Sequence, residues 1–360
     1  MKKNIFEDLF VLELANNHWG KVERGIKIIE DFAKIVRFNN IRAAIKLQFR
    51  DVDTFIHQDF KKRQDIRYIK KTVATKMDIK QYQLLVDAIR KNNCVPMATP
   101  FDEKSVDTCV KLGVEIIKIA SSDINDWILI EKIATTRKPV VVSTGGSSLK
   151  DIDDLVTFFE HRDIPLAINH CVSIYPCEKE ELELNQIDFL KNRYPGHVIG
   201  FSTHEHNNNL EESIQMAYAK GARTFERHID IEADDIPVSP YCSLPQDIDR
   251  WIKAYQRAVV SCGHSSDAKN LPPRKEITYL DALVRGVYAR WDLPKGHKLT
   301  DEDIYLAIPL QKGQISCREL MRGEVLLTDI KKDEPVLISQ IDSPYAHNKA
   351  LKDLIDKRGL

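Results

Sequence analysis

The segment Val198–His228 reads VIGFSTHEHNNNLEESIQMAYAKGARTFERH. It begins with a short apolar run, Val198–Phe201, and continues through a polar cluster into Leu210–Lys220, where apolar residues recur at the spacing of an amphipathic helix. A second apolar run, Thr224–Phe225, follows and also ends in polar side chains. The order strand, helix, strand predicts a βαβ unit with two parallel strands.

The same order of apolar run, polar cluster and helical stretch repeats on both sides of this unit, through residues 1–262. Several runs are uninterrupted apolar stretches, as expected of parallel strands buried on both faces. Eight strands alternating with helices over about 250 residues are typical of a (β/α)8 TIM barrel, an α/β fold. An open doubly wound sheet is the alternative, but no GxGxxG follows the first run. The predicted strands are Phe10–Leu14, Ala43–Leu47, Val95–Ala98, Ile116–Ile119, Pro139–Val142, Leu166–Ile168, Val198–Phe201 and Thr224–Phe225.

The pattern changes near Cys262. The stretch Gly263–Lys275 is polar and contains two prolines, so residues 263–283 are predicted to form a linker. Residues 284–343 contain short β-like runs between charged turns, which predicts a small β-rich domain with a core that is marginal by itself. Residues 344–360 are predicted to be a charged tail that either forms a terminal helix or frays. The strands expected in the small domain are Val287–Ala289, Ile304–Ala307, Val325–Leu327 and Pro335–Ile338.

Composition excludes several classes of function. The formal net charge of -1 gives no electrostatic reason to expect a nucleic acid or an anionic membrane as partner. The N-terminus has no sustained apolar run and no stretch approaches about 18 apolar residues, so neither a signal peptide nor a membrane span is predicted. The seven cysteines are scattered without a CxxC motif, which indicates reduced thiols and a cytoplasmic location.

Polar residues follow every predicted barrel strand. Barrel enzymes place their active sites at the C-terminal ends of the strands, so these clusters predict one shared site there. Lys46 and Lys118 each end a buried run, and together with nearby hydroxyl groups they suit a phosphate dianion. The alternative is that each lysine simply extends to solvent. The hydroxyl groups belong to Thr99, Ser121, Ser143 and Ser202, beside a turn at Gly145–Gly146.

Two histidines and two carboxylates complete the predicted site. His204 and His228 follow adjacent strands, so their rings are expected to converge on one divalent metal ion, unless both are structural histidines. Glu13 and Asp123 lie at the expected mouth of the barrel, where a carboxylate can orient a sugar hydroxyl or act as a general base. Asp123 also fits a helix cap, because SSDIND is a good capping sequence.

An ordered series of short motifs resembles the N-acetylneuraminate (sialic acid) synthase family over nearly the whole chain. Each motif is weak by itself, but their order is specific. The C-terminal stretch DLPKGHKLTDEDI resembles the antifreeze-like (SAF) domain of the same enzymes. The barrel motifs are ELANNHWG (13–20), KLQ (46–48), ATPFD (98–102), KIASSDIN (118–125), KPVVVSTG (138–145), NHCVSIYP (169–176), GFSTH (200–204) and ERH (226–228).

The resemblance implies a transferase that condenses phosphoenolpyruvate with an open-chain aldose to form a 3-deoxy-2-ulosonic acid and phosphate. It implies a divalent metal cofactor, with Mn²⁺ expected and Mg²⁺ or Co²⁺ as alternatives. It also implies a domain-swapped homodimer, in which the SAF domain of one subunit caps the barrel of its partner. The implied site has Lys46, Thr99, Lys118, Ser121, Ser143, Ser173 and Ser202 on phosphoenolpyruvate, His204 and His228 on the metal, Glu13, Gln48, Tyr175 and Ser239 on the sugar, and Glu13 and Asp123 in catalysis.

The sequence departs from the family on the sugar side. Asp123 stands where the family has glutamate, and Ser173 where it has asparagine. Ser239 aligns with an aspartate, and Ile308 with an arginine associated with the acceptor's N-acetyl group. A site that lacks these hydrogen-bonding groups is expected to prefer an acceptor other than N-acetylmannosamine, such as another modified hexose or an aldose without an N-acetyl group. Two other hypotheses stay open: a metal-dependent barrel aldolase or isomerase that does not use phosphoenolpyruvate, and a non-catalytic homologue.

Overall fold

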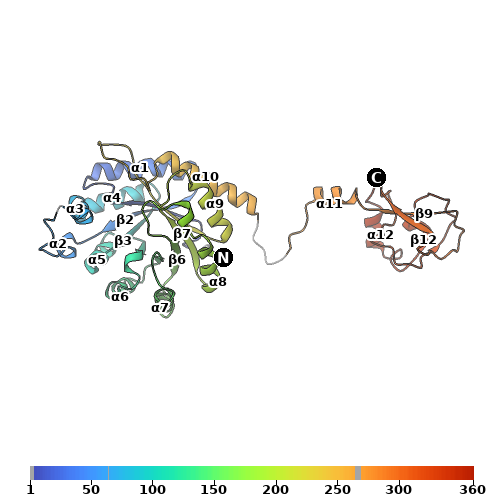
Figure 1. The fold of residues 1–360 in the computed structure, drawn as a ribbon, viewed down its shortest axis with the longest axis horizontal. Helices are drawn as coiled ribbons and strands as arrows, with labels where there is room; N and C mark the ends of the chain where they lie inside the picture. Colours follow the sequence, from blue (N-terminus) through green and yellow to red (C-terminus); the bar gives the residue numbers. More distant parts are fainter. Residues whose placement is uncertain (1–3, 64, 264–268) are drawn as a thin grey trace. The chain divides into compact units, whose positions relative to one another are not determined.

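The computed structural model describes residues 4–63, 65–263 and 269–360. The chain forms two compact units, residues 1–264 and 265–360. In the first unit eight parallel strands close into a barrel in sequence order, so the predicted TIM barrel is confirmed (Figure 1). The strands are β1 (Leu9–Ala15), β2 (Arg42–Phe49), β3 (Val95–Pro100), β4 (Ile116–Ile119), β5 (Val140–Ser143), β6 (Leu166–Cys171), β7 (Val198–Thr203) and β8 (Thr224–His228).

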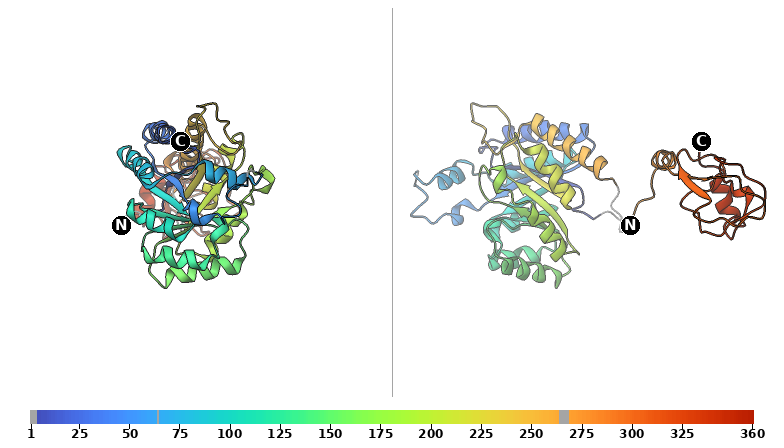
Figure 2. Two further views of the ribbon diagram at one scale, coloured as in Figure 1. Left: turned by 90° about the vertical axis from the view of Figure 1, so that its left-hand side faces the viewer. Right: turned by 45° about the vertical axis from the view of Figure 1, so that its right-hand side comes forward.

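Helices cover the outside of the barrel (Figures 1 and 2). Good capping sequences start several of them; Asp78 and Gln81, for example, form a capping box before α4. Besides α4, the connection between β2 and β3 carries the shorter helices α2 and α3. The helices are α1 (Val22–Phe38), α2 (Val52–Phe55), α3 (Arg67–Ala74), α4 (Ile79–Lys91), α5 (Glu103–Lys111), α6 (Trp127–Thr135), α7 (Leu149–Glu160), α8 (Asn185–Arg193), α9 (Leu210–Lys220) and α10 (Pro245–Cys262), with 3-10 turns at Ser121–Asp123 and Lys179–Glu181.

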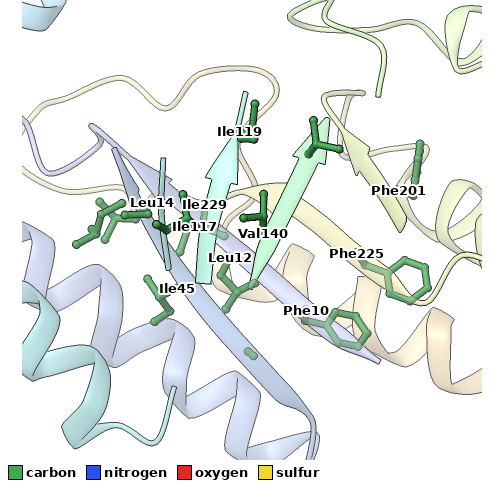
Figure 3. Close-up of a cluster of buried hydrophobic side chains, with 14 of the residues drawn as sticks. Phe10, Leu12, Leu14, Ile45, Ile117, Ile119, Val140, Phe201, Phe225 and Ile229 are labelled. Carbon is green, nitrogen blue, oxygen red and sulfur yellow. The ribbon is translucent and has the colours of Figure 1, made fainter. Parts of the chain in front are cut away.

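Alternation along the strands separates the helix-facing core from the barrel interior. In β1, Phe10 belongs to the core between strands and helices, where its ring lies 5.3 Å from the ring of Trp251 on α10 (Figure 3). Leu9 and Val11 belong to a second apolar cluster, formed by alternate residues of six strands. Because successive side chains point to opposite faces, Glu13 continues the inward row. The interior is therefore apolar near the N-terminal ends of the strands and polar near their C-terminal ends.

The second unit is a small β-rich domain around its own apolar core, as predicted. Its described part is mostly loop, with two short antiparallel sheets, and is coloured orange to red in Figure 2. One sheet pairs β9 with β10 and the other pairs β11 with β12. The elements are α11 (Arg274–Asp281), β9 (Gly286–Ala289), β10 (Ile304–Ala307), β11 (Val325–Leu326), a 3-10 turn at Ile338–Gln340, β12 (Ile341–Asp342) and α12 (Lys349–Ile355).

Two regions of the second half differ from the sequence prediction, and a third decides between two predicted outcomes. The segment Pro335–Ile338 is not a strand, because its amides bond alternately to Val287 and Gly313 and so build no continuous ladder. The predicted linker is helical over α11, and its residues 264–268 lie outside the described residues. The predicted tail forms the terminal helix α12, one of its two expected outcomes, and Ile355 of this helix is buried in the core of the second unit.

Two expectations from composition concern the whole chain. Within the described residues, no helix has both the length and the apolar character needed to cross a membrane. The seven cysteines are free thiols, of which Cys262 and Cys317 are exposed and the others buried.

Candidate active site

A cavity of about 650 Å³ opens among the C-terminal ends of the barrel strands. Inward-facing residues of the barrel strands line it, together with residues from α3 and from the segments that follow each of the eight strands. The structure therefore brings most of the predicted site residues into one enclosure. Those in its lining are Glu13, Lys46, Gln48, Thr99, Lys118, Ser121, Ser143, Ser173, Tyr175, Ser202, His204 and His228.

The cavity floor is a chain of buried opposite charges. Lys46 Nζ lies 2.6 Å from Glu13 Oε2 and 3.4 Å from Glu226 Oε1. Lys118 Nζ lies 2.8 Å from the other oxygen of Glu226. Gln48 Nε2 donates to Glu13 Oε1 at 2.7 Å. The two lysines thus do not extend to solvent; each is held inside the barrel by a carboxylate.

The two carboxylates of the floor differ in their protonation equilibria. Burial raises the pKa of Glu13, although Lys46 opposes the shift. Burial acts in the same direction on Glu226, but the charges of Lys118 and Lys46 outweigh it and hold the pKa of Glu226 well below its ordinary value. Glu226 is therefore firmly ionised, whereas Glu13 accepts a proton more readily.

Hydroxyl groups surround this floor. Thr99 Oγ1 accepts from Lys46 Nζ at 3.1 Å, and the amide of Gly145 donates to Ser121 Oγ at 3.1 Å. The buried Ser143 hydroxyl has no hydrogen-bond partner among the described residues. A Cβ on Gly145 would lie 2.2 Å from Ser173 Oγ, so only glycine lets this turn come so close. The result is a polar surface with a free donor beside two ammonium groups, which suits an oxyanion.

The rings of His204 and His228 lie 5.4 Å apart at the same end of the barrel. Burial lowers the pKa of His204 to about 4 and that of His228 well below its ordinary value. His204 Nδ1 lies 3.0 Å from the carbonyl oxygen of Val172, which can only accept, so Nε2 is left as the free lone pair. Two neutral imidazoles with open nitrogens fit a divalent metal ion. Among the described residues no group of three potential ligands forms, so other ligands would come from substrate or water.

A second buried ion pair lies behind the histidines. Arg227 Nη1 is 3.0 Å from Glu205 Oε1, and both side chains are fully buried. Ser213 Oγ donates to the same carboxylate at 2.6 Å, and Arg227 Nη2 donates to Asn207 Oδ1 at 3.0 Å. Glu205 follows His204 and Arg227 precedes His228 in the chain. The pair thus ties together the ends of β7 and β8 that carry the two histidines.

Two predicted site residues lie outside the cavity lining. Asp123 ends the 3-10 turn after β4, and burial raises its pKa. It does not cap the following helix, because Asp126 accepts from Leu129 N and is the N-cap of α6. Ser239 is also absent from the lining, where Tyr241 appears instead.

Sequence reasoning placed Glu226 in the polar cluster after the eighth strand but gave it no role, and it missed Arg50 and Lys71; all three line the cavity. Glu226 could have been found from the sequence. Two lysines at inward positions of a barrel require buried carboxylates, and Glu226 lies two residues before His228, so both side chains point to the same face of the strand. Arg50 lies two residues beyond Gln48 and continues the inward row of β2. Lys71 had no such signal, because it reaches the cavity from α3.

Known proteins resemble this chain over nearly its whole length. A crystal structure of a spore coat polysaccharide biosynthesis protein E from Chromobacterium violaceum superposes with a TM-score of 0.89, at 37% identity over 94% of this chain and 100% of that one. The N-acetylneuraminate-9-phosphate synthase of Drosophila melanogaster is 26% identical over 92% of this chain and 95% of its own. The N,N'-diacetyllegionaminic acid synthase of Campylobacter jejuni is 24% identical over 91% and 98%.

Family models cover both units. Residues 284–342 match the SAF domain, which agrees with the small β-rich domain of the second unit. Residues 39–266, which include strands β2–β8 and helix α10, match the NeuB family. The chain therefore belongs to the NeuB family and carries a C-terminal SAF domain.

Proposed function

We propose that the protein condenses phosphoenolpyruvate with an open-chain aldose to form a 3-deoxy-2-ulosonic acid and phosphate. The observation that carries this proposal is the cavity floor, where Lys46 and Lys118 lie among hydroxyl groups and Ser143 is unpartnered. Ammonium and hydroxyl donors in this arrangement suit the phosphate and carboxylate of phosphoenolpyruvate. Relatives that align over nearly the whole chain are named as synthases of nonulosonic acids, which supports the same reaction class.

Bound phosphoenolpyruvate would accept hydrogen bonds from the ammonium groups of Lys46 and Lys118. In the structure these groups contact the carboxylates of Glu13 and Glu226. The carbon–carbon bond forms between C3 of phosphoenolpyruvate and the aldehyde carbon. Water adds to C2, and the bond between C2 and the phosphate oxygen breaks, so one water is consumed for each phosphate released. Holding both reactants in one enclosed cavity accounts for much of the expected acceleration.

Glu13 is the proposed acceptor of the water proton. It lines the cavity, and burial brings its pKa closer to the operating pH, as general base catalysis favours. Glu226 is a poorer base because two lysines hold it ionised. Asp123 lies outside the lining and is the weaker candidate on geometry.

His204 and His228 are the proposed ligands of a divalent ion, Mn²⁺ in the first instance and Mg²⁺ or Co²⁺ as alternatives. Such an ion, when bound, supplies a Lewis acid for the aldehyde carbonyl of the sugar. Tyr175 lies against His204, with ring centroids 3.9 Å apart, and Gln48 is oriented by Glu13. Both side chains are proposed to contact the sugar.

The reaction is tested by phosphate release from phosphoenolpyruvate in the presence of Mn²⁺ and a panel of aldoses with and without N-acetyl groups. Release that requires both an aldose and phosphoenolpyruvate is expected, with N-acetylmannosamine a poor acceptor. Aldol cleavage or isomerisation without phosphoenolpyruvate would instead identify the metal-dependent aldolase or isomerase. Binding of phosphoenolpyruvate without turnover of any aldose would identify a non-catalytic homologue.

A further inference from the structure

The cations that line the cavity fall into two sets. Lys46 and Lys118 each lie within 3.0 Å of a carboxylate oxygen, as described above. Arg50 and Lys71 line the same cavity, yet no carboxylate of the described residues lies within 4.0 Å of either. One side of the cavity therefore carries two cations that form no direct ion pair with a described carboxylate.

Arg50 is fixed in position with most of its donors unused. Its guanidinium carbon lies 3.7 Å from the centre of the Phe101 ring, a stacked arrangement that holds the group in place. One nitrogen, Nη1, donates to Gln48 Oε1 at 3.0 Å. A guanidinium has five N–H donors in a planar fork that matches carboxylate and phosphate oxygens. Arg50 thus presents a preformed anion-binding group at the cavity wall.

Lys71 approaches the cavity from α3. It is half-buried, and its ammonium lies 5.5 Å from the ring centre of Trp19. Burial lowers the pKa of Lys71; Cys242 and Asp230 oppose this shift, and the positive charges of Arg67 and Arg50 add to it. An anion bound beside Lys71 would stabilise its charged form.

These two cations belong to the acceptor side of the site. Arg50 donates a hydrogen bond to Gln48, which is proposed to contact the sugar. The hydroxyl groups proposed to hold phosphoenolpyruvate come instead from β3, β4, β5 and β7 and the turns after them. Side chains that suit sugar hydroxyls, Asn16, Asn17 and Thr72, line the cavity together with Arg50 and Lys71.

We propose that the acceptor aldose is itself an anion, and that Arg50 and Lys71 bind its phosphate or carboxylate group. This inference rests on the proposed function, since it assigns the substrate class of the same site. It also accounts for the departures of the sequence on the sugar side, because an acceptor bound by its charge does not depend on the groups that this chain lacks.

The experiment measures binding and turnover of matched aldoses by phosphoenolpyruvate-saturated full-length protein. Each set holds a neutral aldose, its 6-phosphate and the corresponding uronate, so that the two sources of negative charge are separated. Calorimetry reports binding and phosphate release reports turnover, at low and high salt. One of the anions is expected to bind at least about tenfold more tightly than the neutral sugar, the typical gain from a charge-assisted hydrogen bond.

Two variants test whether Arg50 and Lys71 cause the preference for an anionic aldose over a neutral one. Arg50→Gln and Lys71→Met are each expected to weaken binding of the anionic aldose by about tenfold or more, a larger loss than either variant causes for the neutral sugar or for phosphoenolpyruvate. Lys70→Met is the matched control, because Lys70 is an exposed neighbour on α3 that does not line the cavity.

The inference is overturned if neutral sugars bind as tightly as their anionic counterparts, or if the two variants leave the preference intact. Turnover of neutral aldoses alone would overturn it while leaving the proposed function standing. Failure to bind phosphoenolpyruvate itself would instead remove the proposed function. The separate calorimetric titration of phosphoenolpyruvate distinguishes these two failures.

Discussion

Two clusters of buried charge lie at the same end of the barrel and behave differently. The floor cluster, Glu13, Lys46, Lys118 and Glu226, lines the cavity, and its side chains are between 1% and 7% exposed. The rear pair, Glu205 and Arg227, is fully buried behind the histidine-bearing strands and is not part of the lining of this cavity.

The groups that surround each cluster indicate a binding role for the floor cluster and a structural role for the rear pair. Protein groups surround the rear pair, including Ser213 and Asn207, so no ligand can replace them. The floor lysines lie beside an unpartnered hydroxyl and a cavity large enough for two small substrates, so a ligand can exchange for their carboxylates. Burial of charge by itself does not mark a functional site; access to a cavity does.

The strongest test of this contrast is Glu205→Ala. The substitution leaves the guanidinium of Arg227 buried without its carboxylate, which is expected to lower the free energy of unfolding by about 3–5 kcal/mol. Urea unfolding followed by tryptophan fluorescence reports mainly on the first unit, which contains Trp19, Trp127 and Trp251.

Glu211→Ala, which removes partly exposed ion pairs with Arg250 and Arg257, is the control and is expected to cost less than about 1 kcal/mol. Equal losses in both variants would show that the rear pair has no special structural role.

The floor cluster is expected to respond in the opposite way to Lys118→Met. Phosphoenolpyruvate should bind about 100-fold more weakly, because charge-assisted hydrogen bonds are lost. The stability loss should be smaller than for Glu205→Ala, since Glu226 keeps Lys46 as a partner. Calorimetric titration gives the affinity, with the exposed Lys111→Met on α5 as control. An unchanged affinity would remove Lys118 from the binding site.

Gly145→Ala tests the shape of the cavity rather than its charge. The added methyl group would lie 2.2 Å from Ser173 Oγ and 2.9 Å from Ser121 Oγ, so both hydroxyls must move. Phosphoenolpyruvate is expected to bind about tenfold more weakly, the cost of displaced hydrogen bonds.

Two further variants isolate this clash. Gly196→Ala should be neutral, because nothing lies within 4 Å of its added methyl group. Ser173→Ala in the Gly145→Ala background should recover part of the affinity if the clash with Ser173 is the cause. A double variant no better than Gly145→Ala would contradict this explanation.

The smallest expected effect is the pH dependence contributed by Glu13. Because burial raises its pKa above 4.5, its contribution to stability is complete below that value and is lost as pH rises through the folded-state pKa. Glu13→Gln lacks this titration. As the pH rises from about 4 to about 8, the natural protein should therefore lose stability relative to the variant, as measured by the free energy of unfolding. Urea unfolding across this range measures it, with exposed Glu115→Gln as control; a shift in favour of the natural protein would refute the assignment.

Periodicity was sufficient to predict the barrel because burial repeats every second residue along each strand. The polar residues at the ends of the predicted strands also predicted that Lys46, Lys118, His204 and His228 share one site, and all four line the cavity. Periodicity was insufficient for Asp123, whose place depends on a 3-10 turn after β4. It was also insufficient for Pro335–Ile338, where β-like residues divide their hydrogen bonds between two segments.

The sequence by itself determined the barrel, the small second domain and the end of the barrel at which the chemistry-bearing residues gather, since these follow from local alternation of apolar and polar side chains. Only the tertiary structure decided which charges are paired. Lys118 meets Glu226 across 108 residues of chain, whereas Arg50 and Lys71 meet no carboxylate within the described residues. Electrostatic energy depends on distances between atoms of different strands and helices, and folding alone sets those distances.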